Sequence, residues 1–296
     1  MHTSTLKKLA LALTFWLALH MSSLRAQIFT DDLPLQAVTT GTNPVDFEFR
    51  SDGTLIAKGN INVGTLLSTD QGAGTRMFWL PSLGAFRAGG IVTTTNAIHD
   101  WDLANIGKYS MALGYDTMAS GEYSVALGVG GKATGEYSVA LSEGSAVGTG
   151  AVAINGYAGG YYSLAMGTGS AYGDYSIAFG ASTASGYRST AFGYRTTASG
   201  YFSTAMGSYT TASAYLSFVI GSYNVGLSST GAASSPTTWV PIDPIFEIGN
   251  GAAGTASNNY TPTLSDAFVV YKDGSATFQG PVKVAPGGDI PMYTGE

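Results

Sequence analysis

Few residues in this chain have the types and spacing that catalysis requires. Of the three histidines only His99 lies beyond the first 26 residues, and it precedes Asp100 and Asp102. A histidine beside carboxylates can act as a general base or in a Ser-His-Asp device, but this segment fits a solvated turn better. The two aspartates do not provide the set of oxygen ligands that calcium needs, and a zinc site lacks ligands. We expect no metal, no cofactor and no enzymatic activity.

Two other patterns admit a catalytic interpretation and a structural one. Glu122 and Glu136 lie one repeat apart and could form the carboxylate pair of a glycosidase, although regularly spaced glutamates on a repeat are usually solvated. The glycine-rich stretch 128–132 lacks the spacing of a phosphate-binding loop. The structural interpretation is favoured in both places.

Tyrosines offer the clearest candidate for binding. They recur at the repeat spacing, either directly before a serine or directly after a turn glycine, so stacking would align them in ladders. Tyrosine suits binding surfaces because its rigid ring ends in a polar group, but such ladders can also only cover coil edges or pack between protomers. The candidate ligand-contact ladder comprises Tyr109, Tyr123, Tyr137, Tyr162, Tyr175, Tyr187, Tyr201 and Tyr215.

Composition limits the classes of function. Lys7 and Lys8 precede an apolar run of 11 residues, and the segment ends on the small residue Ala26, which is typical of a signal peptide at 1–26. No later stretch approaches the length of a membrane-spanning helix, so we expect a secreted or cell-surface protein. The chain has 13 basic and 19 acidic residues, which become 10 and 19 after cleavage, a net charge of about −9 that disfavours nucleic-acid binding. Cysteine is absent, so disulfides do not hold the fold.

A repeated frame, Ser-x-Ala-x-Gly, organises the middle of the chain. Nine copies, some degenerate, advance by 12 to 14 residues between positions 110 and 221. Period-2 alternation and frequent β-branched residues predict strands, and glycine-rich segments between frames predict turns. Each repeat is therefore interpreted as one coil of an all-β solenoid, with two strands of about five residues.

The alternation leaves two arrangements open. Either the large residues fill the thin coil and the small ones permit another layer to approach, or the reverse holds. In both cases one face needs a partner, which predicts a homo-oligomer. The predicted repeat core contains Ala112, Leu113, Ala126, Leu127, Ala140, Leu141, Ala153, Ile154, Ala165, Met166, Ala178, Phe179, Ala191, Phe192, Ala205, Met206, Val219 and Ile220.

The frames, from Ser110-Met111-Ala112-Leu113-Gly114 onward, resemble the head repeats of trimeric autotransporter adhesins, the YadA-like head, over residues 106 to about 224. The resemblance implies a left-handed parallel β-roll of about nine coils that assembles as a homotrimer. That family continues into a coiled-coil stalk and an outer-membrane β-barrel, and neither pattern is evident in this sequence.

The flanks carry a second repeat. Residues 49–63 align without gaps on 270–284, and each places Asp-Gly between alternating segments, which predicts a hairpin and a further short strand. They resemble the β-rich connectors of phage fibres and bacterial surface proteins. We expect a cap and connector at 27–105, the β-roll at 106–225, an irregular neck at 226–266 fastened by Trp239 and Phe246, and a hairpin connector and tail at 267–296.

Three functions fit these patterns. The first is an adhesin-like surface protein whose rigid trimeric rod binds extracellular matrix proteins, glycans or other cells. The second is a structural fibre or spacer with no specific ligand. The third is a β-solenoid hydrolase, which is least favoured because no cluster of acids interrupts the repeat.

Overall fold

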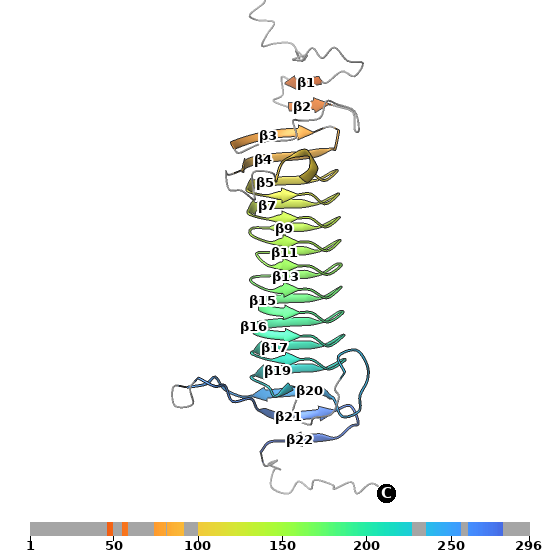
Figure 1. The fold of residues 1–296 in the computed structure, drawn as a ribbon, viewed down its shortest axis with the longest axis vertical. Helices are drawn as coiled ribbons and strands as arrows, with labels where there is room; N and C mark the ends of the chain where they lie inside the picture. Colours follow the sequence, from red (N-terminus) through yellow and green to blue (C-terminus); the bar gives the residue numbers. More distant parts are fainter. Residues whose placement is uncertain are drawn as a thin grey trace, which may run out of the picture. The chain divides into compact units, whose positions relative to one another are not determined.

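The computed structural model describes residues 46–49, 55–58, 74–80, 82–91, 100–226, 235–255 and 260–280 (Figure 1). The chain divides into two compact units, one of residues 1–66 with 79–84 and one of 67–78 with 85–296. The only helical element in the described part is a 3-10 turn, η1 (Leu103–Asn105). The predicted all-β class is confirmed. The predicted signal peptide, His99 and residues 281–296 lie outside the described residues.

Each frame forms one strand of a parallel stack (Figure 1). Every strand pairs with the frame strand of the next repeat, so that frame alanines lie opposite one another until Val219 takes the last place. The predicted solenoid is thereby confirmed, and its left-handed sense stays a prediction. The nine strands are β5 (Met111–Tyr115), β7 (Val125–Val129), β9 (Val139–Leu141), β11 (Val152–Ile154), β13 (Leu164–Met166), β15 (Ile177–Ala184), β16 (Thr190–Ala198), β17 (Thr204–Ser208) and β19 (Phe218–Ser222).

The return strands are shorter than the predicted five residues. Six of them contain two residues, and β15 and β16 instead continue through the turn into the return side. Turns use the rest of each coil, because residues at two corners adopt positive φ angles and reverse the chain. The two-residue strands are β6 (Met118–Ala119), β8 (Lys132–Ala133), β10 (Ser145–Ala146), β12 (Tyr157–Ala158), β14 (Ser170–Ala171) and β18 (Thr211–Ala212).

Small side chains fill the interior of the coils. Every frame alanine, every alanine of a two-residue return strand, and Val219 are fully buried. Five frame serines are also buried and donate their hydroxyl hydrogen bonds to the carbonyl oxygen three residues earlier, which closes the turn. The interior is therefore a column of methyl groups and short hydroxyls.

The large members of the predicted core lie elsewhere. None of Leu113, Leu127, Leu141, Ile154, Met166, Phe179, Phe192, Met206 and Ile220 is buried in the single chain. They point outward because alternation along the strand places them opposite the alanines. Of the two arrangements left open by the sequence, the structure has small residues inside, and the large residues are corrected to an outer surface.

Glycines at one turn of each coil permit the close approach of the next coil. A Cβ atom on Gly121 would lie 2.0 Å from the carbonyl oxygen of Gly135 in the next coil, and glycines at the same place in later coils meet similar clashes. The last such place holds Ala214, whose Cβ has no further coil of this kind above it. The turn glycines therefore allow adjacent coils to stack at the spacing of hydrogen-bonded strands, and the small interior reflects a narrow coil whose two walls enclose alanines.

Two strands extend the stack beyond the nine frames. Strand β4 (Ala85–Ile91) pairs in parallel with β5 and places Arg87 opposite Ala112. Strand β20 (Pro244–Asn250) pairs in parallel with β19 and places Glu247 opposite Val219. The column of alanines thus ends in a buried charged residue on each side.

Hairpins are found at both predicted places. Strand β21 (Asp266–Tyr271) pairs with β20 and with β22 (Ala276–Phe278) in antiparallel fashion, and Asp273-Gly274 forms the turn between β21 and β22. In the other unit, β1 (Asp46–Phe49) pairs antiparallel with β2 (Leu55–Lys58). Strand β3 (Gly74–Leu80) follows along the chain. The pairing between the two aligned strands is confirmed in each copy.

Candidate binding surface

The turn before each frame serine forms a corner of the coil, which we term the aromatic corner. The residue directly before the serine has a φ angle between 50° and 68° in every coil. Five of the predicted tyrosines take this place, and it is otherwise occupied by glycine, arginine, phenylalanine or leucine. We term the residue at this place the rung of its coil. The rungs are Tyr109, Tyr123, Tyr137, Gly150, Tyr162, Tyr175, Arg188, Phe202 and Leu216.

In the earlier coils, the tyrosine rings of the aromatic corner form parallel stacks. The ring centroids of Tyr109 and Tyr123 are 5.2 Å apart, and those of Tyr123 and Tyr137 are 4.9 Å apart with an interplanar angle of 3°. A second stack joins Tyr162 and Tyr175 at 5.6 Å. Because the rings cover one another's faces, these stacks present mainly ring edges and hydroxyl groups to solvent.

The later coils place aromatic rings at two neighbouring positions. Tyr187, Tyr201 and Tyr215 each precede the rung residue, and Tyr187 contacts Tyr175 and Phe202 edge to face at 5.8 and 5.6 Å. The guanidinium of Arg188 lies 5.3 Å from the ring centroids of both Tyr175 and Tyr187 and 5.9 Å from that of Phe202. The structure therefore places all eight predicted tyrosines on this corner, in two adjoining rows.

Carboxylates lie among the first tyrosines. Burial of its hydroxyl raises the pKa of Tyr123, and the negative charge and hydrogen bonding of Glu122 raise it further. Burial and Glu136 raise the pKa of Tyr137 in the same way. The two glutamates therefore act on the hydroxyls of the tyrosines that follow them in the chain. The arrangement favours binding through polar ring edges over glycoside hydrolysis.

A second aromatic ladder, not predicted from the sequence, lies on the opposite corner, after the frame glycine. Tyr209 stacks on Tyr223 at 4.4 Å and meets Tyr194 edge to face at 5.6 Å. Arg195 lies 5.8 and 5.5 Å from the rings of Tyr194 and Tyr209. Their regular spacing behind the frame glycines was the signal that could have revealed them.

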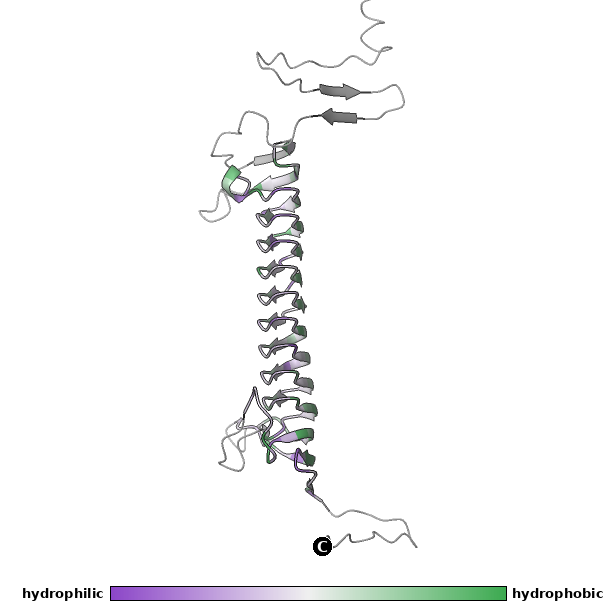
Figure 2. Cartoon of the chain, turned by 90° about the vertical axis from the view of Figure 1, so that its right-hand side faces the viewer, coloured by the Kyte–Doolittle hydropathy of each residue, from purple (hydrophilic) through white to green (hydrophobic). Residues whose placement is uncertain are grey.

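The outer side of the frame strands is a broad apolar surface, which we term the frame face. It contains the two residues that flank each frame alanine, for example Val125 and Leu127 in β7. Phe192 is 52% exposed, and Met166, Met206 and Phe218 are exposed to a lesser degree. Figure 2 shows hydrophobic residues recurring on the strands along the stack. The outward residues of the return strands include Lys132, Ser145, Thr183, Thr197 and Thr211 and are more polar.

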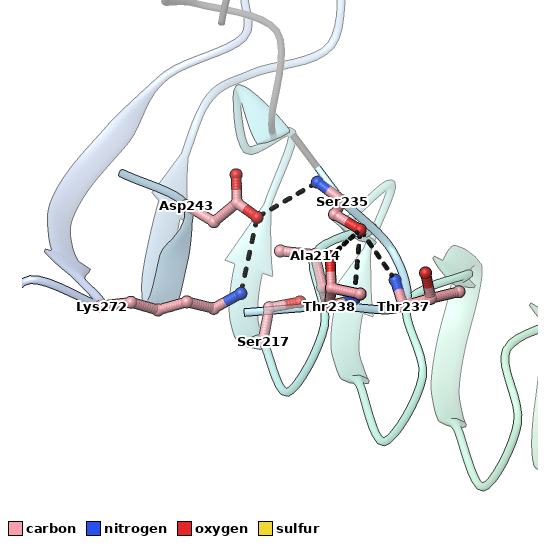
Figure 3. Close-up of polar contacts among 7 residues, drawn as sticks. All are labelled: Ala214, Ser217, Ser235, Thr237, Thr238, Asp243 and Lys272. Atoms are coloured by element: carbon pink, nitrogen blue, oxygen red, sulfur yellow. Dashed lines mark hydrogen bonds and ion pairs between the residues drawn. The ribbon is translucent and has the colours of Figure 1, made fainter. Parts of the chain in front are cut away.

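The last coil is closed by contacts among Ser235, Trp239, Asp243 and Lys272, which we term the clasp. Figure 3 shows those of Ser235, Asp243 and Lys272. The carboxylate of Asp243 accepts a hydrogen bond from the Ser235 backbone amide at 3.2 Å and lies 3.5 Å from the Lys272 ammonium. Lys272 also lies 5.4 Å from the Trp239 ring centroid. Phe246 stacks on Phe218 of β19 at 5.8 Å, so both predicted fasteners contact this end of the stack or its clasp.

The remaining chemical candidates are structural. Asp100 and Asp102 are buried, which corrects the expectation of a solvated turn, and residues 128–132 form a solenoid turn followed by β8. Among the residues described, no group of three or more histidine, cysteine, aspartate or glutamate side chains could hold a metal ion. The described part of the chain also contains no helix long and apolar enough to span a membrane.

A family model described as the YadA head domain repeat (two copies) matches residues 106–130, 158–183 and 184–210. The stacked coils at these residues match the YadA head repeat. No curated protein matches the chain. This match supports an adhesin-like surface protein, and heads of this kind are typically non-enzymatic.

The coils are least regular where the family model finds no match. Residues 131–157 contain Ser142 in place of a frame glycine and the degenerate frame 151–155. The same interval contains Gly150, the only rung of the aromatic corner that has no side chain. Backbone pairing nevertheless continues through β9 and β11, so the irregularity affects the surface and leaves the stack intact.

Proposed function

We propose that this protein is a secreted or surface-displayed adhesin-like protein whose YadA-like head assembles as a homotrimer. The frame face carries the proposal, because it leaves large apolar residues uncovered on nine consecutive strands. Monomeric proteins rarely expose continuous apolar patches of this kind. A cyclic assembly around a common axis covers the face and closes.

In this proposal the segments have separate roles. Residues 1–26 direct export, 27–105 and 267–296 act as connectors, 106–225 form the head, and 226–266 form the neck. Once the frame faces meet at the axis, the aromatic corner is available for ligands such as matrix proteins or glycans. Its tyrosines and carboxylates suit polar recognition.

Light scattering on the purified chain tests the assembly. The expected mass is three times that of one chain after removal of residues 1–26. Changing Phe192 and Met206 to aspartate puts charges on the frame face and is expected to give monomers with unchanged β-sheet circular dichroism. Changing Thr197 and Ser199 to aspartate on the return side serves as the matched control and is expected to leave the trimer intact. A folded monomer of the unmodified chain contradicts the proposal.

A spacer without a ligand is the second candidate, and the ring stacking of the aromatic corner favours it because stacked tyrosines also stabilise repeats. Retention of the protein on immobilised collagen, fibronectin or glycans separates the two functions. For an adhesin, changing Tyr123 and Tyr137 to serine is expected to reduce retention while the trimer persists. A trimer that binds none of these surfaces supports the spacer.

A further inference from the structure

One rung of the aromatic corner is bare. Gly150 takes the place that tyrosine holds in the coils before and after it. Tyr137 stacks on Tyr123 on one side, and Tyr162 stacks on Tyr175 on the other. Among the ring contacts of the described residues, none joins Tyr137 to Tyr162. The stack is therefore interrupted at this coil.

Ring exposure confirms the interruption. Tyr137 and Tyr162, which flank Gly150, are 53% and 58% exposed, whereas Tyr109, Tyr123 and Tyr175 are 42–45% exposed. A Cβ atom on Gly150 would lie 2.5 Å from Cδ1 of Tyr162, so this ring leans over the bare rung. The exposed rings of Tyr137 and Tyr162 thus border the position of the missing side chain.

Another coil shows what this corner accepts in place of a tyrosine. Arg188 occupies a rung with the same backbone conformation, at a φ angle of 54°. Its guanidinium lies among three aromatic rings at centroid distances of 5.3 to 5.9 Å. A planar cation over aromatic faces is favourable because the ring quadrupole attracts positive charge.

Charge around the bare rung suits a cation. Glu136 precedes Tyr137 and is exposed, and Asp174 accepts a hydrogen bond from the backbone amide of Tyr161 at 2.9 Å. On this corner, Glu122, Glu136 and Asp174 directly precede rungs, and no lysine or arginine lies at or directly before a rung between 123 and 175. A cation arriving at Gly150 therefore meets attraction from both the rings and the carboxylates.

We propose that the interruption at Gly150 binds the guanidinium group of an arginine side chain on a partner protein. The guanidinium inserts between Tyr137 and Tyr162, as Arg188 does among its own rings, and Glu136 acts as its counter-ion. Tyr162 turns toward Tyr175 to admit it. This inference rests on the proposed function, because it takes the aromatic corner to be the surface displayed to partners.

The test is a titration of the full chain, labelled with ¹³C in its tyrosine rings, with the acetylated and amidated peptide Gly-Arg-Gly. The expected result is a saturable shift of the Tyr137 and Tyr162 signals, with a dissociation constant of about 10 mM for one exposed site. The matched peptide Gly-Lys-Gly is expected to bind at least about fivefold more weakly, because an ammonium lacks the planar surface.

Substitutions locate the site. Gly150→Tyr restores the missing rung, whose backbone conformation tyrosine adopts in five other coils, and is expected to weaken binding at least about tenfold. Ser142→Tyr is the matched control, because it adds a tyrosine at positive φ on the opposite corner. Glu136→Gln keeps the fold and is expected to weaken binding about threefold, which provides a second test if Gly150→Tyr misfolds.

The outcomes are distinct. Equal binding of the arginine and lysine peptides, or unchanged binding by both Gly150→Tyr and Glu136→Gln, overturns the proposed site. A trimer that adheres to a matrix or glycan surface but shows no arginine-dependent shift retains the proposed function and rejects this inference alone. Conversely, a monomer whose tyrosines respond to the arginine peptide retains the site and rejects the trimer.

Discussion

The two ends of the solenoid have oppositely charged residues, Arg87 and Glu247, at the position that alanine occupies in the frame. At the β4 end, the Arg87 guanidinium donates to the carbonyl oxygens of Ser110 and Ala119 and to the Ser110 hydroxyl, at 2.8 to 3.1 Å. At the β20 end, one oxygen of Glu247 accepts a hydrogen bond from the Asn224 amide at 2.8 Å. Carbonyl oxygens line the interior of the coils, and the N–H groups of the Arg87 guanidinium donate hydrogen bonds to several of them. The Glu247 carboxylate has fewer hydrogen-bond partners.

The pKa values record this difference. Burial lowers the pKa of Arg87 only to about 10, so the residue remains charged near neutral pH. Burial raises the pKa of Glu247 to about 7, and nearby Asp266 adds to the rise while hydrogen bonds from Asn224 and the Gly226 backbone oppose it. One end is therefore closed by a permanent charge, and the other by a group that titrates near neutrality.

Removing the permanent charge should have the largest effect. Arg87→Ala deletes a fully buried side chain and its hydrogen bonds, and we expect the β4 end to lose about 4 kcal/mol of local stability. In a solenoid each coil contacts only its neighbours, so the loss should stay at that end. Hydrogen-exchange protection of β5 and β7 should fall while that of β17 and β19 is unchanged. A uniform loss along the stack contradicts this account.

The second prediction concerns the titrating end. The folded pKa of Glu247, about 7, exceeds its ordinary value of 4.5, so the folded state holds the proton more tightly. The stabilisation is complete below pH 4.5 and is lost as pH rises to 7, by at most about 3 kcal/mol. Burial also raises the pKa of Asp266, which gives a slope of the same sign.

Glu247→Gln isolates the contribution of one group. The neutral variant should be close to the unmodified protein at pH 4 and more stable at pH 8, and it should retain only the slope that Asp266 provides. Exchange protection of β19, corrected for the intrinsic rate at each pH, measures the effect. If the slope in Glu247→Gln equals that of the unmodified protein, Glu247 is not the titrating group.

Sequence patterns were sufficient for the repeated part of the fold. The frame spacing predicted parallel strands and the tyrosine rows, because both depend on a period that the chain repeats nine times. It did not decide which face is inside, since alternation is symmetric until the width of the coil is known. The two-residue return strands and the full burial of the alanines show a narrow coil, whose walls enclose only small side chains.

Caps were expected at both ends, but the charged residues that continue the frame there were missed although their signal is present. Phe86-Arg87-Ala88-Gly89 and Phe246-Glu247-Ile248-Gly249 both keep the frame x-Ala-x-Gly with a charge in place of alanine. The second follows β19 only after an intervening segment of 21 residues, 223–243, so periodicity alone did not connect it. Pairing of Gly249 with Gly221 shows that it continues the same register.

The smallest expected effect is that of replacing Trp239 at the β20 end, which we compare with replacing Trp101 at the β4 end. Trp101 is fully buried and its indole N–H donates to the Thr117 carbonyl oxygen at 2.7 Å, whereas Trp239 is 50% exposed and contacts Lys272 through its ring. Trp239→Leu should cost about 1 kcal/mol, the value of a partly solvated cation–π contact. Trp101→Leu, the matched change, should cost about 3 kcal/mol through lost packing and an unpaired carbonyl.

Local exchange again gives the measurement, in β18 and β19 for Trp239→Leu and in β5 and β6 for Trp101→Leu. Lys272 keeps its ion pair with Asp243 and its contact with the Tyr215 ring at 5.8 Å when Trp239 is replaced, which is why the loss should be small. A cost for Trp239→Leu that equals the cost for Trp101→Leu would mean that the ring, and not the ion pair, holds the clasp. In that case the β20 end depends on aromatic packing as much as the β4 end does.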